Sequence, residues 1–228
     1  GNPIAVILVL AAIVVGCVVD NFFSWGNLSN LLSNTAVRFL IALGVSGCLI
    51  TKGTDLSAGR QVGLAACISA GLQLTTNKLF PGLQIMPIPV VLLCVLVACA
   101  LVGLVNGFFM AKFKLHPFIV TLSTQLIVYG LVLLFMQLGT NGGQTLSGMS
   151  EGYRNFIIKP LFTLKTSSGP VTVPRYVLYS TIITAIVWVI WNKTAFGKNM
   201  YAVGSNEEAA NVSGVNVTAT IILVFVLA

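Results

Sequence analysis

The residues of this chain that could do chemistry are few, and most are polar side chains set among apolar ones. The densest group occupies residues 51–60. Gly53 and Gly59 permit a helix to break there, and either Thr54 or Asp55 can cap a new helix start. Broken helices of this kind line solute pathways in transporters. We therefore predict a pathway-lining segment, with an ordinary cytoplasmic turn between two membrane spans as the alternative.

Charged and amide side chains inside apolar runs extend this candidate pathway. A charge within a span usually faces protein or water, which favours a buried Arg60 with Asp55 as its nearest candidate partner. Asn106 and Gln125 could donate hydrogen bonds to a polar solute such as a sugar, or simply to a neighbouring helix. The candidate pathway residues are Thr54, Asp55, Ser57, Arg60, Asn106 and Gln125.

A second polar segment, residues 204–214, lies between two apolar stretches near the end of the chain. Ser205 and Glu208 have the spacing of a capping box, in which each side chain satisfies a backbone N–H at a helix start. Glu207 and Glu208 then fall in the first turn, where the helix dipole favours negative charge. Gly214 stands where such a helix should stop. The pattern predicts a short helix that a partner could grip; a helical loop without a task is the alternative.

The composition places these segments in a membrane protein. The chain has 228 residues, of which 57% are apolar and 7% charged, and its mean hydropathy is +0.98. A span needs about 20 apolar residues, and only helices and closed barrels satisfy every backbone group in lipid. Continuous apolar runs, without alternation, favour helices. The runs cover residues 4–19, 35–51, 56–75, 87–111, 117–138 and 176–191, and another begins at residue 218.

We therefore predict an all-α, polytopic transmembrane helical bundle with about six complete spans and the start of a seventh. Residues 1–228 form a single transmembrane domain in this prediction. Because the first residue is not Met and the last lies in an apolar run, we expect a fragment of a longer protein, truncated at its C-terminus. Two glycine pairs, Gly59 with Gly63 and Gly103 with Gly107, have the spacing that lets helices approach closely in lipid.

The basic residues predict the orientation, because Lys and Arg are retained in cytoplasmic loops. Residues 112–116 and the segment that begins at residue 193 are locally basic and are separated by two predicted spans, so they share one side. We place residues 193–217 and the amino terminus in the cytoplasm. Residues 139–175 are then extracytoplasmic, either as a partner-facing surface or as a loose connection.

Missing motifs narrow the function. The five cysteines all lie inside apolar runs and lack the spacing of metal ligands. The chain also lacks HExxH, GxSxG and Walker A motifs and any paired-carboxylate arrangement. We expect neither enzymatic activity nor a metal site. Active transport would then take its energy from a separate ATPase, which we favour, or from an ion gradient acting at Asp55 and Arg60. An ion-coupled secondary transporter and a passive channel or membrane scaffold are the alternatives.

Three segments together resemble a known family. Residues 208–214 are similar to the EAA loop of ATP-binding-cassette (ABC) importer permeases. With residues 53–63 and 193–199, they resemble the ribose permease-like branch, which imports monosaccharides. Within it, residues 54–66 are most similar to the galactose and methyl-galactoside permeases.

The resemblance implies a multi-pass subunit of the bacterial cytoplasmic (inner) membrane that works by alternating access. It would pair with a second copy, receive a monosaccharide from an extracytoplasmic binding protein and dock ABC ATPase subunits, which bind the ATP. The resemblance implies no cofactor in this chain, and the charge pattern indicates contact with phospholipid and no nucleic acid. The implied ATPase-coupling residues are Gly204, Ser205, Glu207, Glu208, Ala209, Ala210 and Gly214.

Overall fold

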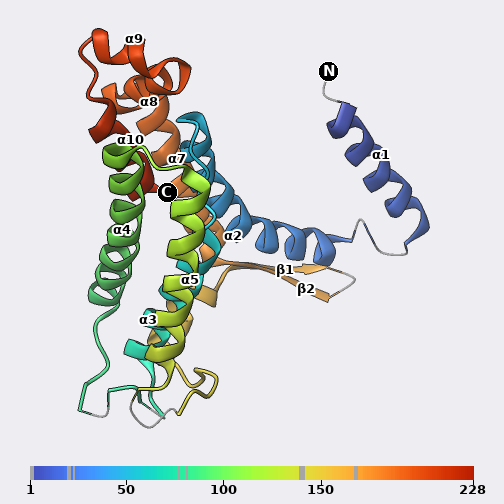
Figure 1. The fold of residues 1–228 in the computed structure, drawn as a ribbon. Helices are drawn as coiled ribbons and strands as arrows, with labels where there is room; N and C mark the ends of the chain where they lie inside the picture. Colours follow the sequence, from blue (N-terminus) through green and yellow to red (C-terminus); the bar gives the residue numbers. More distant parts are fainter. Residues whose placement is uncertain are drawn as a thin grey trace.

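The computed structural model describes residues 3–19, 22, 24–76, 78–80, 82–138, 142–166 and 169–228. They form a mostly helical molecule in which the long helices stand side by side and two short ones cap one end (Figure 1). The helices are α1 (Pro3–Val18), α2 (Trp25–Ile50), α3 (Ala58–Gln73), α4 (Ile88–Phe113), α5 (Pro117–Met136), α6 (Glu151–Ile158), α7 (Arg175–Lys193), α8 (Ala195–Ser205), α9 (Glu207–Val212) and α10 (Val217–Leu227). The strands are β1 (Pro160–Thr166) and β2 (Gly169–Pro174).

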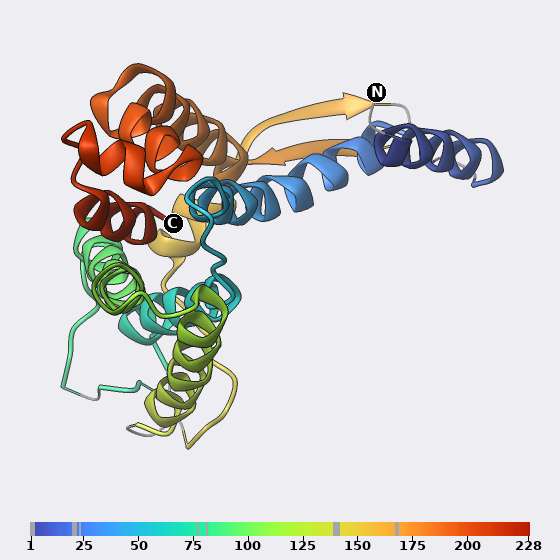
Figure 2. The same cartoon turned by 45° about the horizontal axis from the view of Figure 1, so that its top comes forward.

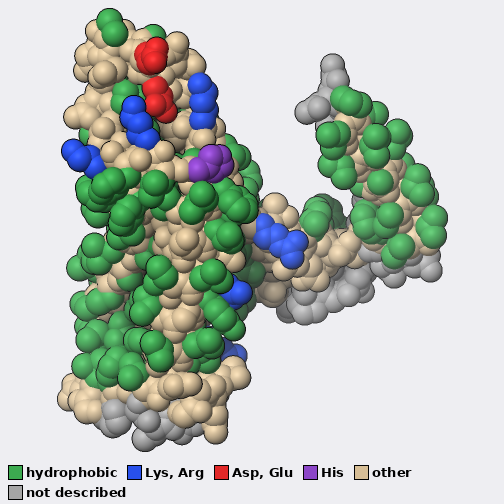
Figure 3. All heavy atoms as spheres, in the orientation of Figure 1, with side chains coloured by type: hydrophobic (Ala, Val, Ile, Leu, Met, Phe, Trp, Pro, Cys, Tyr) green, Lys and Arg blue, Asp and Glu red, His purple; other side chains and the backbone are tan. Residues whose placement is uncertain are grey.

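Each predicted apolar run falls on a helix, as expected for segments that must satisfy their own backbone hydrogen bonds in lipid. Four helices, α2, α4, α5 and α7, are long and apolar enough to cross a bilayer. Many apolar side chains point outward, including Leu96 on α4 and Leu126 on α5, which are 66% and 64% exposed. Figure 3 shows hydrophobic side chains covering the length of the bundle, with charged ones gathered toward the end that carries α8 and α9. This distribution fits a helical membrane protein.

The all-α prediction misses a β-hairpin. Strands β1 and β2 pair antiparallel and extend away from the bundle beside the first half of α2 (Figures 1 and 2). The hydroxyl of Ser29 donates to the carbonyl of Thr172 at 2.7 Å and so fixes the hairpin to α2. The described part of residues 139–175 therefore contains helix α6 and a sheet, which is more structure than a loose connection would have.

Helix α1 stands apart from the other long helices (Figure 1). The main cluster of buried side chains lies beneath α8 and α9 and is shared by α2, α8, α9 and α10. Its members are Cys48, Met200, Val203, Ala210, Ile221, Val224 and Phe225. The end of the molecule that carries the second polar segment is therefore packed onto the bundle.

One glycine pair makes the close contact that its spacing predicts. A Cβ atom on Gly103 would lie 2.1 Å from the carbonyl oxygen of Phe225, and one on Gly107 would lie 2.7 Å from Cα of Ile222. Helices α4 and α10 therefore meet backbone to backbone. The other prediction is wrong for the described chain, because a Cβ atom on Gly59 or Gly63 would meet nothing within 4 Å. Gly59 and Gly63 therefore lie on an open face of α3.

Candidate functional site

The predicted short helix exists, but its cap is not the predicted one. Ser205 is the last residue of α8, and the chain turns at Asn206, whose backbone is extended with φ −155°. Asn206 Oδ1 accepts a hydrogen bond from the backbone N–H of Ala209 at 3.1 Å. The capping box is wrong by one residue because Asn caps a helix as well as Ser does, and α8 continues through Ser205. Glu207 and Glu208 still lie in the first turn of α9, as predicted.

The predicted stop at Gly214 is confirmed. Gly214 has φ +84°, a left-handed conformation that glycine adopts at little cost, and its N–H donates to the carbonyl of Asn211 at 3.0 Å. The next residue, Val215, donates to the carbonyl of Ala210 at 3.0 Å. These two bonds form a Schellman motif, which satisfies the last carbonyl groups of the helix. Helix α9 is thus fixed at both ends despite its length of six residues.

Helix α9 has an inner and an outer side. Ala210 is only 4% exposed and packs in the buried cluster, so it anchors the helix. Glu207, Glu208 and Ala209 are exposed. Val212, which the sequence analysis did not single out, is 90% exposed. An apolar side chain in a polar segment was the signal that could have found it. Val212 gives the outer side of α9 an exposed apolar surface.

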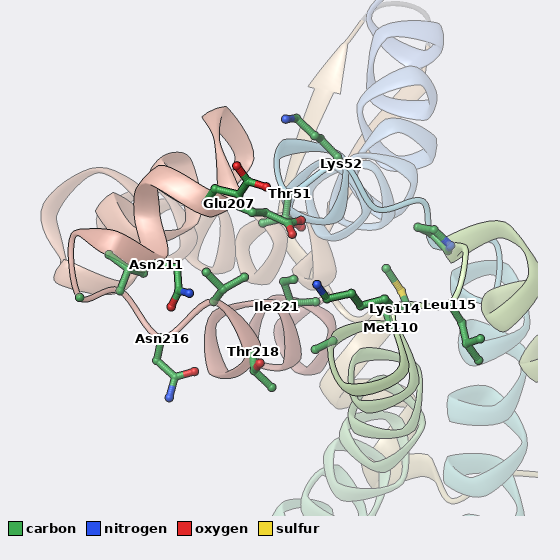
Figure 4. A pocket seen from close by; sticks show the side chains of 16 residues that line it. Thr51, Lys52, Met110, Lys114, Leu115, Glu207, Asn211, Asn216, Thr218 and Ile221 are labelled. Carbon is green, nitrogen blue, oxygen red and sulfur yellow. The ribbon is translucent and has the colours of Figure 1, made fainter.

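A cavity of about 720 Å³ brings the two polar segments together. Thr51 and Lys52 line it beside Glu207 and Glu208, and Lys114 reaches into it from the end of α4 (Figure 4). Residues 51–57, the basic end of α4 and helix α9 therefore lie at one end of the molecule. Residues 112–116 and the segment that begins at residue 193, which were predicted to share one side, therefore lie at the same end of the molecule, and their side of the membrane stays a prediction.

The connection between α2 and α3 is neither a solvated turn nor a helix. Residues 51–57 are non-helical, and their side chains alternate between two environments. Thr51, Gly53, Asp55 and Ser57 are buried, whereas Lys52 and Leu56 are exposed. We call these seven residues the 51–57 connection. It joins two helices, as a turn does, but places every second residue inside the protein.

Three of the candidate pathway residues meet inside the bundle. The carboxylate of Asp55, which is 4% exposed, accepts hydrogen bonds from the backbone N–H of Ser57 at 2.8 Å and from its hydroxyl at 2.6 Å. The Ser57 hydroxyl in turn accepts from Asn106 Nδ2 and from Gln61 Nε2, both at 3.0 Å. Asn106 Oδ1 is buried, and the described residues offer it no hydrogen-bond partner. We call Asp55, Ser57, Gln61 and Asn106 the polar cluster.

The remaining candidates are Thr54, Gln125 and Arg60. The backbone carbonyl of Thr54 accepts a hydrogen bond from the hydroxyl of Thr121 on α5 at 3.1 Å. Gln125 is half-buried on the same helix. Arg60 is exposed, and its guanidinium carbon lies 4.4 Å from the centre of the Tyr129 ring. The expected pairing of Asp55 with Arg60 is wrong, because α3 begins at Ala58 and directs its first turn outward at Arg60 while the carboxylate points inward.

Sequence reasoning missed Gln61 and Thr121. Gln61 lies four residues after Ser57, a spacing that puts two side chains on one face where a helix begins. This local signal was available. Thr121 is fully buried and meets the 51–57 connection across 67 positions of the chain, so nothing local in the sequence reveals that contact.

A bundle of apolar helices with a capped helix at one end and a buried polar cluster fits a multi-pass membrane protein. Residues 27–228 match the family described as the permease component of the branched-chain amino acid transport system. The chain belongs to this family.

Among individual relatives, the chain is similar to the galactose/methyl galactoside import permease protein of Salmonella typhimurium, with 44% identity over 230 residues. The corresponding protein of Haemophilus influenzae is 42% identical, and the ribose import permease protein of Escherichia coli (strain K12) is 31% identical. The matches cover 100%, 98% and 97% of this chain and 66%, 65% and 63% of those relatives. The chain thus spans slightly less than two thirds of their length. No solved structure matches it.

Proposed function

We propose that this chain is the transmembrane permease subunit of an ABC importer for a monosaccharide, galactose or a methyl galactoside. The observation that carries the proposal is the 44% identity, along the whole chain, to a relative named for that transport. The more distant relatives are named for ribose, which favours a sugar over an amino acid within this family. Helix α9 supports the proposal independently, since it is short, fixed at both ends and acidic on its outer side.

In this proposal the protein lies in the bacterial inner membrane and crosses it about six times. Helices α1, α2, α3, α4, α5 and α7 are the spans, and α10 begins a seventh. Helices α8 and α9 are cytoplasmic, and residues 139–175 face the outside. The positive-inside rule supports this orientation, because the basic end of α4 lies at the same end of the molecule as α9.

The proposed mechanism is alternating access driven by a separate ATPase. Glu207, Glu208 and Val212 present the outer side of α9 to the ATPase, while Ala210 fixes the helix to the core beneath it. ATP binding closes the ATPase dimer and displaces α9, and the spans then change which side of the membrane the solute pathway faces. The polar cluster lies on that pathway and supplies hydrogen-bonding groups in an otherwise apolar interior. The chain needs no cofactor of its own.

The partners in this proposal are an ATPase subunit on α9, an extracytoplasmic sugar-binding protein at residues 139–175 and a second copy of the permease. The hairpin and α6 give the binding protein a shaped surface rather than a flexible one.

Reconstitution of the full-length protein tests the proposal. The permease, its ATPase and its binding protein are placed in lipid vesicles, and uptake of labelled galactoside is measured with and without ATP on the α9 side. We expect accumulation that requires ATP and survives ionophores. Uptake that collapses with ionophores while ATP is present would identify an ion-coupled transporter. Equilibration without ATP, together with failure of an ATPase to copurify, would identify a channel or scaffold.

A further inference from the structure

Lys52 connects the two polar segments directly. Its ammonium group donates a hydrogen bond to the backbone carbonyl of Ser205, the last residue of α8, at 3.2 Å. The two residues are 153 positions apart in the chain. Lys52 also has φ 58°, a left-handed conformation that is uncommon for any residue other than glycine. The backbone of the 51–57 connection therefore adopts an unfavourable conformation at the residue whose side chain reaches α8.

The end of α8 offers a suitable acceptor. The last carbonyl groups of a helix lack partners within the helix and carry partial negative charge. Helix α8 has no basic residue in its own last turn. Lys52 supplies this positive charge from a different part of the chain, immediately before the turn at Asn206 that begins α9.

A backbone contact accompanies this hydrogen bond. A Cβ atom on Gly204 would lie 2.0 Å from the carbonyl oxygen of Ile50, the last residue of α2. The ends of α2 and α8 thus touch without an intervening side chain. Because the contact is backbone against backbone, α8 cannot move toward α2 without displacing the start of the 51–57 connection.

The rest of the 51–57 connection contacts three further helices. The Ser57 hydroxyl bonds Asn106 on α4, and the carbonyl of Thr54 bonds Thr121 on α5. A Cβ atom on Gly53 would lie 3.0 Å from the ring of Phe225 on α10. A short, non-helical and partly buried stretch of chain therefore contacts α8 at one end and α4, α5 and α10 along the rest of its length.

We propose that the 51–57 connection transmits the displacement of α9 and α8 to the spanning helices, and that Lys52 is the positioning residue that fixes its first residues to α8. This inference rests on the proposed function, because it needs an ATPase that displaces α9. The direct packing of α8 and α9 on the core is one route for this displacement. The 51–57 connection is a second route, and it leads to the polar cluster.

Lys114 provides a matched control. It lines the same cavity, and it too is an exposed lysine in a left-handed conformation, with φ 51°. The described residues give Lys114 no hydrogen bond to α8, and it is not among the proposed docking or pathway residues. A Lys→Met substitution at either position removes the charge and keeps the apolar stem, so the two variants differ in the contact with Ser205.

The experiment uses the full-length permease with its ATPase and binding protein in lipid vesicles. For Lys52→Met we expect undiminished copurification of the ATPase but roughly three- to fivefold less sugar transported per ATP hydrolysed, the size expected for loss of one solvent-exposed hydrogen bond. Lys114→Met should keep the wild-type ratio, and Lys52→Arg should restore most of it. If Lys52→Met fails to accumulate in the membrane, the ratio is measured on Lys52→Gln.

The outcomes separate this inference from the proposed function. A wild-type ratio in Lys52→Met overturns the inference, and so does an equal loss in Lys114→Met. Loss of the ATPase from the purified Lys52→Met complex also overturns it, since Lys52 would then serve docking rather than transmission. ATP-independent behaviour of the wild-type protein would instead overturn the proposed function.

Discussion

The hydroxyl oxygen of Ser57 accepts a hydrogen bond from the side-chain amide of Asn106 at 3.0 Å, and both residues are fully buried. This bond joins the start of α3 to the C-terminal third of α4 across 49 positions of the chain. An apolar interior makes such a bond expensive to break, because an unpaired buried polar group costs about 1–3 kcal/mol. The polar cluster therefore fixes two helices relative to one another and leaves one buried oxygen, Asn106 Oδ1, without a partner among the described residues.

Replacement of Asp55 tests whether the polar cluster stabilises the protein and whether it is needed for transport. In Asp55→Ala the N–H and hydroxyl of Ser57 lose their acceptor, so we expect about 1–3 kcal/mol of destabilisation and reduced uptake. Asp55→Asn keeps an acceptor oxygen and should be more stable than Asp55→Ala. Thermal unfolding in detergent and uptake in vesicles measure the two effects. Wild-type stability and uptake in Asp55→Ala would show that the cluster is dispensable.

The cap of α9 can be tested at adjacent residues. Because Asn206 accepts the hydrogen bond from Ala209, we expect Asn206→Ala to destabilise α9 by about 1 kcal/mol, whereas Ser205→Ala leaves the cap intact. Hydrogen exchange of the α9 amides and ATPase copurification are the measurements.

Asn216 is the matched control for this cap, since it caps α10 by accepting from Ala219 at 2.9 Å. Asn216→Ala should leave exchange in α9 unchanged. Faster exchange in Ser205→Ala than in Asn206→Ala would support the capping box that the sequence suggested.

We also expect the coupling role of α9 to depend on the left-handed conformation of Gly214, where the helix ends. Proline cannot adopt the φ of +84° at Gly214 and lacks the N–H that bonds Asn211, so Gly214→Pro should abolish ATPase coupling. Gly143→Pro is the control. Gly143 has φ +80° and donates to the carbonyl of Met136 at 3.1 Å, which makes the backbone damage comparable outside the segment proposed to dock the ATPase.

Galactoside uptake and sugar-stimulated ATP hydrolysis distinguish these two variants. We expect Gly214→Pro to lose stimulation by sugar while still inserting into the membrane. Gly143→Pro lies in the segment proposed to face the binding protein, and its ATPase should stay bound and keep its basal ATP hydrolysis. Wild-type uptake in Gly214→Pro would show that α9 does not couple transport to ATP.

The two glycine pairs predict opposite responses to one methyl group. Gly103→Ala would force α4 from α10, and overpacking of this kind costs about 1–3 kcal/mol. Gly63→Ala adds a methyl group to open space within a helix, where alanine is favoured over glycine by about 1 kcal/mol. Thermal unfolding of the detergent-solubilised variants should therefore show a loss in the first and no loss in the second. Equal losses would show that another part of the assembly covers the Gly63 face.

Local patterns in the sequence were sufficient for much of this protein. Apolar runs specify helices because a backbone in lipid must satisfy its own hydrogen bonds, and each run is a helix here. Gly214 and the acidic pair at Glu207 and Glu208 predicted α9, since caps and helix dipoles act within one turn. The hairpin at β1 and β2 was missed, because its strands are short and pair only after folding back.

Only the tertiary structure decided which local signals are used. Gly59 with Gly63 and Gly103 with Gly107 share one spacing, yet only the second pair meets a neighbouring helix. Ser205 and Asn206 are both good capping residues, but Asn206 caps α9, because α8 continues through Ser205 where its end packs against Ile50. Contacts such as Lys52 with Ser205 join positions far apart in the chain. The sequence alone could therefore determine the helices of the apolar runs and α9, whose hydrogen bonds span a few residues, while long-range packing determined which side chains meet.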